Sequence, residues 1–323
     1  MRAVFCPAFG QALELRDVAP EPLCPGQVRI KVAAAGVNFA DQLIITGKYQ
    51  EKIEPPFVPG LELAGTITEI AGAVDGLAVG DRVMANVSNG GFAEECVAQG
   101  SDVHKLPDAL DFVTAAGFPV AYGTSHLGLR KAGLTAGEVL VVHGAAGGVG
   151  LTAVEIGVAM GATVIATAGG ADKVKVALDH GAHYGIDYKS EDIRTRIKDL
   201  TAGRGADVIY DPVGGAVFDA SLRAIAPDGR ILVIGFASGE VPQIPANHLL
   251  VKNVTIIGYW WGAYRQLAPQ KVRQSMAEAL DMWAAGKLRP HVGQTLPLAQ
   301  AAEAIALLKS RAVTGKLVLI VGD

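Results

Sequence analysis

A glycine-rich turn is the feature of the sequence with the clearest chemistry. The segment Gly144-Ala145-Ala146-Gly147-Gly148-Val149-Gly150 follows the apolar run Val139–Val142 and precedes a helix-forming stretch. A strand, a glycine turn and a helix in this order offer the free N–H groups of the helix N-terminus to a pyrophosphate. Gly147 lets the backbone approach the phosphates and Gly150 allows close helix–strand packing, although Ala145 replaces the first glycine of the usual pattern. The turn therefore predicts a dinucleotide site, the alternative being a packing turn of an unrelated α/β protein.

The residues after the next expected strand bear on which dinucleotide binds. An NAD site usually carries an acid about 20 residues after the turn, where it accepts from the ribose 2′-hydroxyl. Here the strand ends in Gly169-Gly170, and the first acid is Asp172, followed by Lys173. A carboxylate repels a 2′-phosphate, whereas an open glycine pair with an ammonium nearby accommodates one. The sequence predicts NADPH as the cofactor, and a solvated helix residue is the other interpretation of Lys173.

Two regions with different apolar patterns must position these residues. Up to about residue 118, short strands are separated by Gly and Pro clusters, which is typical of an antiparallel, barrel-like domain. Beyond it, apolar runs alternate with helix-length segments, which predicts a doubly wound parallel sheet covered on both faces. The predicted fold class is α/β, with the sheet domain inserted between two parts of the β-rich one.

The expected elements can be given by residue range. Strands are expected in the first region at 2–6, 27–37, 63–70, 81–87 and 92–98, and in the second at 139–142, 163–167, 208–210, 231–234 and 254–257. Helices are expected at 148–160, 171–180, 191–201 and 215–225. The tail is expected to hold helices at 269–285 and 299–309 and a strand at 317–321.

Bulk composition limits the class of protein. The chain has 323 residues, of which 50% are hydrophobic, so two domains with large cores are expected. A net charge of -4 without a basic stripe argues against nucleic acid as a partner. Three widely spaced cysteines form neither a disulfide framework nor a metal pattern, and no signal peptide or membrane span is predicted. We expect a cytoplasmic protein without a membrane partner.

Several further motifs carry a resemblance to a known family. They are the segments 25–28, 34–41, 59–65, 80–83, 143–150, 211–215, 235–239 and 259–264. With these segments the chain resembles the medium-chain dehydrogenase/reductase superfamily, and within it the zinc-free NADPH:quinone oxidoreductases, over essentially its whole length. The resemblance implies a GroES-like catalytic domain over residues 1–118, completed by 262–323, and a Rossmann domain over 119–261. It also implies a homodimer joined through Rossmann sheet edges.

The resemblance also assigns cofactor contacts to positions of this sequence. Thr124 and Phe236 are expected at the nicotinamide end. The pyrophosphate is expected against Ala146, Gly147, Gly148 and Val149, with Lys316 as a basic contact. The adenosine 2′-phosphate is expected beside Gly169, Gly170, Lys173 and Tyr188.

Zinc-dependent members of the superfamily hold a catalytic metal with side chains at three positions. In this sequence those positions carry Asn38, Leu61 and Ala116, with Glu62 beside them. Leu and Ala cannot ligate a metal and Asn is a poor zinc donor, so no zinc is predicted. Without a metal to polarise an alcohol or ketone oxygen, the substrates expected are quinones and carbonyl-conjugated double bonds, whose negative charge is delocalised during reduction.

Three polar residues are candidates for the catalytic site. The amide of Asn38 can orient the acceptor oxygen or the ribose, or it can cap a turn. Asp41 is expected to fix the loop that contains Asn38. The phenol of Tyr49 can donate a hydrogen bond to the acceptor, or it can merely cover the mouth of the site.

Three functions remain open on the sequence alone. The first is an NADPH-dependent quinone or enone reductase that acts on a small acceptor. The second is a reductase of activated C=C bonds only, as in 2-alkenal or enoyl-type reductases. The third is an NADPH-binding sensor or structural protein without catalysis, because no strong acid–base constellation is visible.

Overall fold

The computed structural model describes residues 1–322 and divides the chain into two compact units. Unit 1 comprises Met1–Val120 and the chain from Pro290 onward, and unit 2 comprises Ala121–Arg289. From the sequence, the inserted domain is expected to end at residue 261, whereas unit 2 continues to Arg289, so the two divisions differ over residues 262–289. These residues pack on the first helix of unit 2, α3 (Pro119–Lys131), where His126 Nδ1 lies 2.8 Å from Ser275 Oγ.

Unit 1 is a β-rich unit with three short α-helices. Its strands are β1 (Arg2–Phe5), β2 (Glu14–Asp17), β3 (Gln27–Val37), β4 (Glu62–Ile70), β5 (Arg82–Asn86), β6 (Glu95–Gln99), β7 (Val103–Lys105), β14 (Val292–Pro297) and β15 (Lys316–Ile320). Its helices are α1 (Phe39–Ile45), α2 (Phe112–Ala116) and α11 (Ala301–Lys309), with 3-10 turns at Gly100–Asp102 and Leu298–Gln300.

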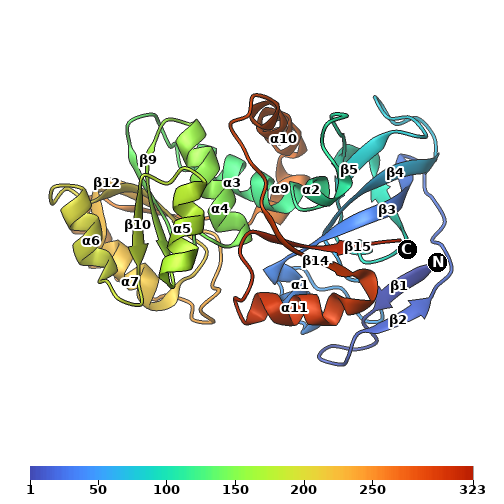
Figure 1. The fold of residues 1–323 in the computed structure, drawn as a ribbon, viewed down its shortest axis with the longest axis horizontal. Helices are drawn as coiled ribbons and strands as arrows, with labels where there is room; N and C mark the ends of the chain where they lie inside the picture. The colour runs from blue at the N-terminus through green and yellow to red at the C-terminus, as the bar shows by residue number, and fades with distance from the viewer. Residues whose placement is uncertain (323) are drawn as a thin grey trace. The chain divides into compact units, whose positions relative to one another are not determined.

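The long strand β3 organises unit 1. The seven-stranded sheet has the order β14-β15-β3-β4-β5-β7, and β6 also pairs with β3. Pairing with β15 and β4 is antiparallel, with Val37 opposite Leu317 and Gly36 opposite Glu62. Helix α1 follows β3 directly and lies beside α11 (Figure 1). The end of β3 and the start of α1 therefore lie next to the ends of β4 and β15.

Unit 2 alternates strands and helices as the sequence predicts. Its strands are β8 (Val139–Val142), β9 (Thr163–Ala168), β10 (Tyr184–Asp187), β11 (Ala206–Asp211), β12 (Ile225–Val233) and β13 (Thr255–Gly258). After α3, its helices are α4 (Gly148–Ala159), α5 (Ala171–Asp179), α6 (Ile193–Leu200), α7 (Gly215–Ala224), α8 (Ala246–Lys252), α9 (Trp261–Leu267) and α10 (Pro269–Ala284).

The strands of unit 2 form one parallel sheet with the order β10-β9-β8-β11-β12-β13. Helices α4 and α5 pack against β8 to β10, α7 packs against β11 and β12, and α8 packs against β12. Figure 1 shows α5 beside β10. The chain leaves β8 toward β9 and later returns on its other side at β11. Ligands of open α/β sheets bind beyond the carboxyl ends of the strands at such a switch point, and the glycine turn follows β8 there. The α/β fold class predicted from the sequence is confirmed.

The core of unit 2 depends on a fully buried phenylalanine of α7. Phe218 packs with Ile209, Ile225 and Ile231 of the neighbouring strands. Truncating a buried Phe removes its transfer free energy and leaves a cavity, so Phe218→Ala is expected to lower the free energy of unfolding by about 3–5 kcal/mol. Urea unfolding measures the change. Val241→Ala, at a residue that is 63% exposed, is the control and is expected to shift it by less than about 0.5 kcal/mol. Equal effects would contradict this account of the core.

Candidate cofactor and active site

The glycine turn after β8 leads directly into α4. Gly147 is the N-cap of α4, and the first intrahelical hydrogen bond runs from Leu151 N to Gly147 O at 2.8 Å. The N–H groups of Gly148, Val149 and Gly150 precede that bond, as in any helix N-terminus. A Cβ on Gly150 would lie 2.2 Å from the carbonyl oxygen of Gly144. Only glycine fits there, so the turn brings free backbone donors close to the strand end, which suits a pyrophosphate.

Buried hydroxyl groups hold the first turn of α4 in place. Ser125 Oγ donates to Val149 O at 2.9 Å and lies 2.8 Å from Thr152 Oγ1 and 3.1 Å from Tyr210 Oη. The predicted nicotinamide contact Thr124 is the neighbour of Ser125 on α3 and is also buried. Sequence reasoning missed this group, because its members come from three separate elements. The network fixes the turn from beneath, relative to α3 and β11.

His143, which directly follows β8, is a structural residue in this geometry. Its Nδ1 lies 2.8 Å from Thr167 Oγ1 and its Nε2 lies 2.7 Å from Ser221 Oγ. The side chain is fully buried, and burial lowers the pKa of the imidazole, which favours the neutral form. Both ring nitrogens are engaged, so His143 ties β8 to β9 and α7.

The second glycine pair lies at the end of β9. Gly170, with φ +110°, is the N-cap of α5, and Lys173 lies in the first turn of that helix. A Cβ on Gly169 would lie 2.7 Å from Tyr188 Oη, so the phenol of Tyr188 lies across this glycine. The structure therefore brings together all four residues expected at the 2′-phosphate.

An acid also lies beside the glycine pair. Asp187, the last residue of β10, accepts hydrogen bonds through Oδ1 from Gly170 N at 2.8 Å and Lys189 N at 3.0 Å. These two backbone bonds, the one from Lys189 first, lower the pKa of the Asp187 carboxyl. Sequence reasoning followed the chain only as far as Asp172 and missed Asp187, because β10 was not among the expected strands. The position of Asp187 directly before Tyr188, a residue already expected at the 2′-phosphate, was the only sign in the sequence that this acid lies near the glycine pair.

A buried polar cluster lies at the end of β3 in unit 1. The ammonium of Lys316 donates to Asn38 Oδ1 and Glu62 Oε1, each at 2.7 Å, and to Val37 O at 3.1 Å. Glu62 is fully buried, and Lys316 and Asn38 are at most 8% exposed. Glu62 also accepts through Oε2 from Val120 N at 2.8 Å. The ammonium expected at the pyrophosphate therefore has three oxygen partners inside unit 1.

The amide of Asn38 is largely engaged by the same cluster. Its Oδ1 accepts from Lys316 and its Nδ2 donates to Glu62 Oε1 at 2.8 Å. An Asn side chain has two donor hydrogens and two acceptor lone pairs. One donor and one acceptor make short bonds, and Nδ2 also donates to Gly36 O over a longer distance of 3.5 Å. The orientation of Asn38 is fixed, and its second N–H is held only by this long bond.

Asp41 holds the backbone at Asn38. Its Oδ2 accepts from Asn38 N at 2.7 Å, and the side chain is fully buried. Burial raises the pKa of Asp41 to about 7, although the Asn38 bond and the charge of Lys316 act in the opposite direction. The expected role of fixing the loop agrees with this bond. The loop itself is the first turn of helix α1.

The remaining predicted residues are Tyr49 and Phe236, together with the two metal positions that carry no donor, Leu61 and Ala116. Tyr49 is half-buried and packs on the small apolar group of Cys6, Ile44 and Phe57. Phe236 follows β12 and is 37% exposed. Leu61 and Ala116 offer no side-chain donor atoms for a metal. Among residues 1–322, no group of three His, Cys, Asp or Glu side chains is arranged to hold a metal ion.

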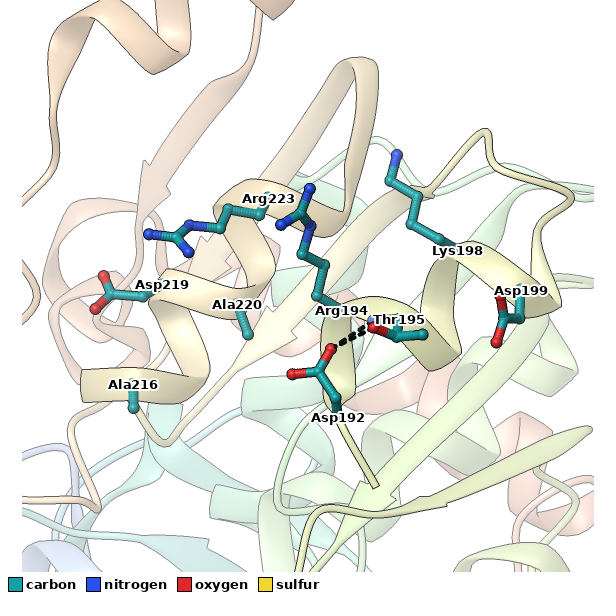
Figure 2. A pocket seen from close by; sticks show the side chains of 9 residues that line it. All are labelled: Asp192, Arg194, Thr195, Lys198, Asp199, Ala216, Asp219, Ala220 and Arg223. Carbon is teal, nitrogen blue, oxygen red and sulfur yellow. Dashed lines mark hydrogen bonds between the residues drawn. The ribbon is translucent and has the colours of Figure 1, made fainter. Parts of the chain in front are cut away.

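A hollow of about 570 Å³ lies elsewhere on unit 2, between α6 and α7 (Figure 2). Side chains of both charges line it, including Asp192, Arg194, Lys198, Asp219 and Arg223. None of the predicted site residues lines this hollow, so it is separate from the site expected at the glycine turn.

Among residues 1–322, no helix is long and apolar enough to cross a membrane.

Comparisons with known proteins agree with the fold. Residues 24–108 match the alcohol dehydrogenase GroES-like domain, and residues 148–282 match the zinc-binding dehydrogenase family model. The quinone oxidoreductase-like protein 2 homolog of Nematostella vectensis is 42% identical over 98% of this chain and 88% of its own. The quinone oxidoreductase of Homo sapiens is 32% identical over 99% of this chain and 98% of that protein. The structure of Escherichia coli quinone oxidoreductase complexed with NADPH is 28% identical in sequence, with a TM-score of 0.93. The match covers 99% of this chain and 100% of that one.

The buried Asp41 makes stability depend on pH. The folded-state pKa of about 7 lies above the ordinary value of an aspartate, 3.8, so the folded chain binds more protons between these values. Stability from this group is complete below about pH 4 and falls as the pH rises to 7, by at most about 1.4 kcal/mol per pH unit. Urea unfolding of wild type and Asp41→Asn from pH 4.5 to 7.5 is expected to show this slope in the wild type only.

The exposed Asp17 of β2 provides the matched control. Asp17→Asn is expected to leave the pH dependence of unfolding unchanged. Parallel stability curves for the wild type and Asp41→Asn would contradict a raised pKa at Asp41.

Proposed function

The chain belongs to the medium-chain dehydrogenase/reductase superfamily, in its quinone oxidoreductase family, and from this membership we propose that it is a zinc-independent enzyme that transfers hydride from NADPH to quinones or other conjugated carbonyl acceptors. One observation carries the proposal. A tight glycine turn offers the backbone N–H groups of a helix N-terminus, which suits a dinucleotide, while two of the three metal positions of zinc-dependent relatives hold residues without donor atoms.

The residues of the two glycine turns fit the cofactor. We propose that Ala146, Gly147, Gly148 and Val149 hold the pyrophosphate, because the N-terminus of α4 offers unpaired N–H groups there. Gly169, Gly170, Lys173 and Tyr188 receive the 2′-phosphate, and Thr124 and Phe236 border the nicotinamide. The ammonium of Lys316 acts first on Asn38 and Glu62, to which it already donates.

NADPH supplies the hydride when bound, and the protein positions the reactants. In this proposal, the N–H of Asn38 that makes only the long bond to Gly36 O turns to the acceptor oxygen, to which the phenol of Tyr49 also donates a hydrogen bond. Asp41 and Lys316 keep Asn38 oriented from its backbone and its side chain. Neutral donors suffice for an acceptor that delocalises negative charge, which favours quinones and enones over simple ketones.

Two other functions compete with this one. A reductase restricted to activated C=C bonds would use the same cofactor cradle and the same metal-free site. An enoyl-thioester substrate with a pantetheine arm would need a basic entrance, which the sequence lacks, so a free small acceptor is favoured. A non-catalytic NADPH-binding protein is the third function. It would bind the cofactor through the same turns and turn over nothing.

An acceptor panel tests the three functions. Purified protein is mixed with NADPH and quinones, enones or simple ketones, while the absorbance of NADPH is followed. We expect turnover with quinones, little with simple ketones, and a higher specificity constant for NADPH than for NADH. Asn38→Ala is expected to lower kcat by roughly 10- to 100-fold, because a donor aimed at developing charge is lost.

The alternatives have separate outcomes in the same experiment. Turnover of enones but not quinones would favour the C=C reductase, and tight NADPH binding without any turnover would favour the sensor. Metal analysis of the same sample completes the test. Stoichiometric zinc in the active protein would refute the zinc-independent mechanism.

We also propose that the chain forms a homodimer through the edge of the parallel sheet in unit 2. In the described part of the chain, β13 is an edge strand that pairs with β12 alone. Large apolar side chains flank it along the chain, and Leu250, Val251 and Leu267 are 75–78% exposed. An open strand edge beside exposed apolar residues is a typical interface between copies.

Light scattering on a sizing column tests the dimer. The wild type is expected to elute at twice the chain mass of 33.4 kDa. The double variant Leu250→Glu/Val251→Glu is expected to shift toward the monomer, because two carboxylates would be buried in the interface. Val79→Glu, at an exposed residue of unit 1, is the control and is expected to stay dimeric. A monomeric wild type would refute the proposal.

A further inference from the structure

A carboxylate is bonded to the glycine pair beside which a 2′-phosphate is expected. Asp187 Oδ1 lies 2.8 Å from the backbone nitrogen of Gly170 and 3.0 Å from that of Lys189. Gly170 is the N-cap of α5, so this carboxylate takes up a backbone donor at the start of that helix. The next residue in the chain, Tyr188, lies across Gly169.

The charges around the glycine pair are therefore mixed. Lys173 and the N-terminus of α5 favour an anion. Asp172 in the first turn of α5 and Asp187 at the end of β10 disfavour one. Asp172 is exposed, whereas Asp187 is partly buried and bonded to the turn itself. Of the two acids, Asp187 is the one whose position is fixed beside the glycine pair.

We propose that Asp187 is a specificity-determining residue that limits the preference of this chain for NADPH over NADH. It does so by keeping a negative charge beside the 2′-phosphate. The inference rests on the proposed function, since it requires that NADPH binds at the two glycine turns. It differs from an ordinary NAD site, where the acid comes from the second strand and accepts from the ribose.

Asp187 has two effects that substitutions can separate. Its Oδ1 holds the turn by accepting two backbone N–H groups, and its charge opposes the phosphate. Asp187→Asn keeps an oxygen that can accept both bonds and removes the charge. Asp187→Ala removes the bonds and the charge together, so the turn is less well held.

Calorimetric binding of NADPH, NADH, 2′,5′-ADP and 5′-AMP measures the effect without any turnover. Relative to wild type, Asp187→Asn is expected to bind NADPH and 2′,5′-ADP roughly 10-fold more tightly, because a like charge beside a phosphate is removed. Its affinities for NADH and 5′-AMP are expected to change less than about two-fold. The gain is expected to shrink at high salt, since screening weakens the repulsion.

Asp192→Asn is the matched control. Asp192 caps α6 by accepting from Thr195 N at 2.8 Å, and Asn caps helices as well as Asp does. The control changes the net charge of the chain by the same amount and is expected to leave all four affinities unchanged. Asp187→Ala is expected to lower the affinity for 5′-AMP and NADH, because the turn that binds both is less well held.

The outcomes separate this inference from the function on which it rests. If wild type binds neither NADPH nor 2′,5′-ADP, the proposed cofactor site itself is wrong. If wild type binds both and Asp187→Asn has the wild-type ratio of NADPH to NADH affinity, only the role of Asp187 is refuted. An equal gain in Asp192→Asn would also refute it, because the effect would then come from net charge alone.

Discussion

The close approach of α4 to the end of β8 is the constraint on which the candidate site depends. The first turn of the helix packs against the Gly144 carbonyl so tightly that a Cβ at Gly150 would overlap it. Packing at this distance needs a fixed helix, and Ser125, Thr152 and Tyr210 fix it through buried hydroxyl contacts. Buried hydroxyls are stable only when they are hydrogen-bonded, so the network and the glycine turn depend on each other.

In unit 1 the main constraint is a buried charge, that of Glu62. Glu62 is fully buried, and removing one partner of a buried ion pair typically costs about 3–5 kcal/mol. The carboxylate is held by Lys316, Asn38 and the Val120 N–H. Gly36 makes room for it, because a Cβ there would lie 2.4 Å from Glu62 Oε1. The strand pairing of β3 with β4 and β15 brings these groups together, so the sheet register determines the cluster.

Strong local patterns made much of the fold predictable. Strands β3 and β8 have the predicted bounds, because continuous apolar or alternating runs end there at turn residues. Strand β10 was missed, since Tyr184-Gly185-Ile186-Asp187 has one fully buried side chain and no periodicity. Asp187 was missed with it. The pair Glu62 and Lys316, 254 residues apart, could not be foreseen as a pair, because nothing in a single sequence reports which strand ends meet.

The hydrogen bonds of the unit 1 cluster also bear on the class of acceptor. Lys316 shares its donors among three oxygens, so its charge is locally compensated by Glu62. The second N–H of Asn38 has only a long bond to Gly36 O, and a neutral hydrogen bond contributes a net of about 0.5–1.5 kcal/mol. A catalytic metal supplies several kcal/mol to a developing alkoxide. A simple ketone concentrates its charge on one oxygen and needs the larger contribution. A quinone spreads the charge over its ring and two oxygens, so the smaller contribution suffices for it.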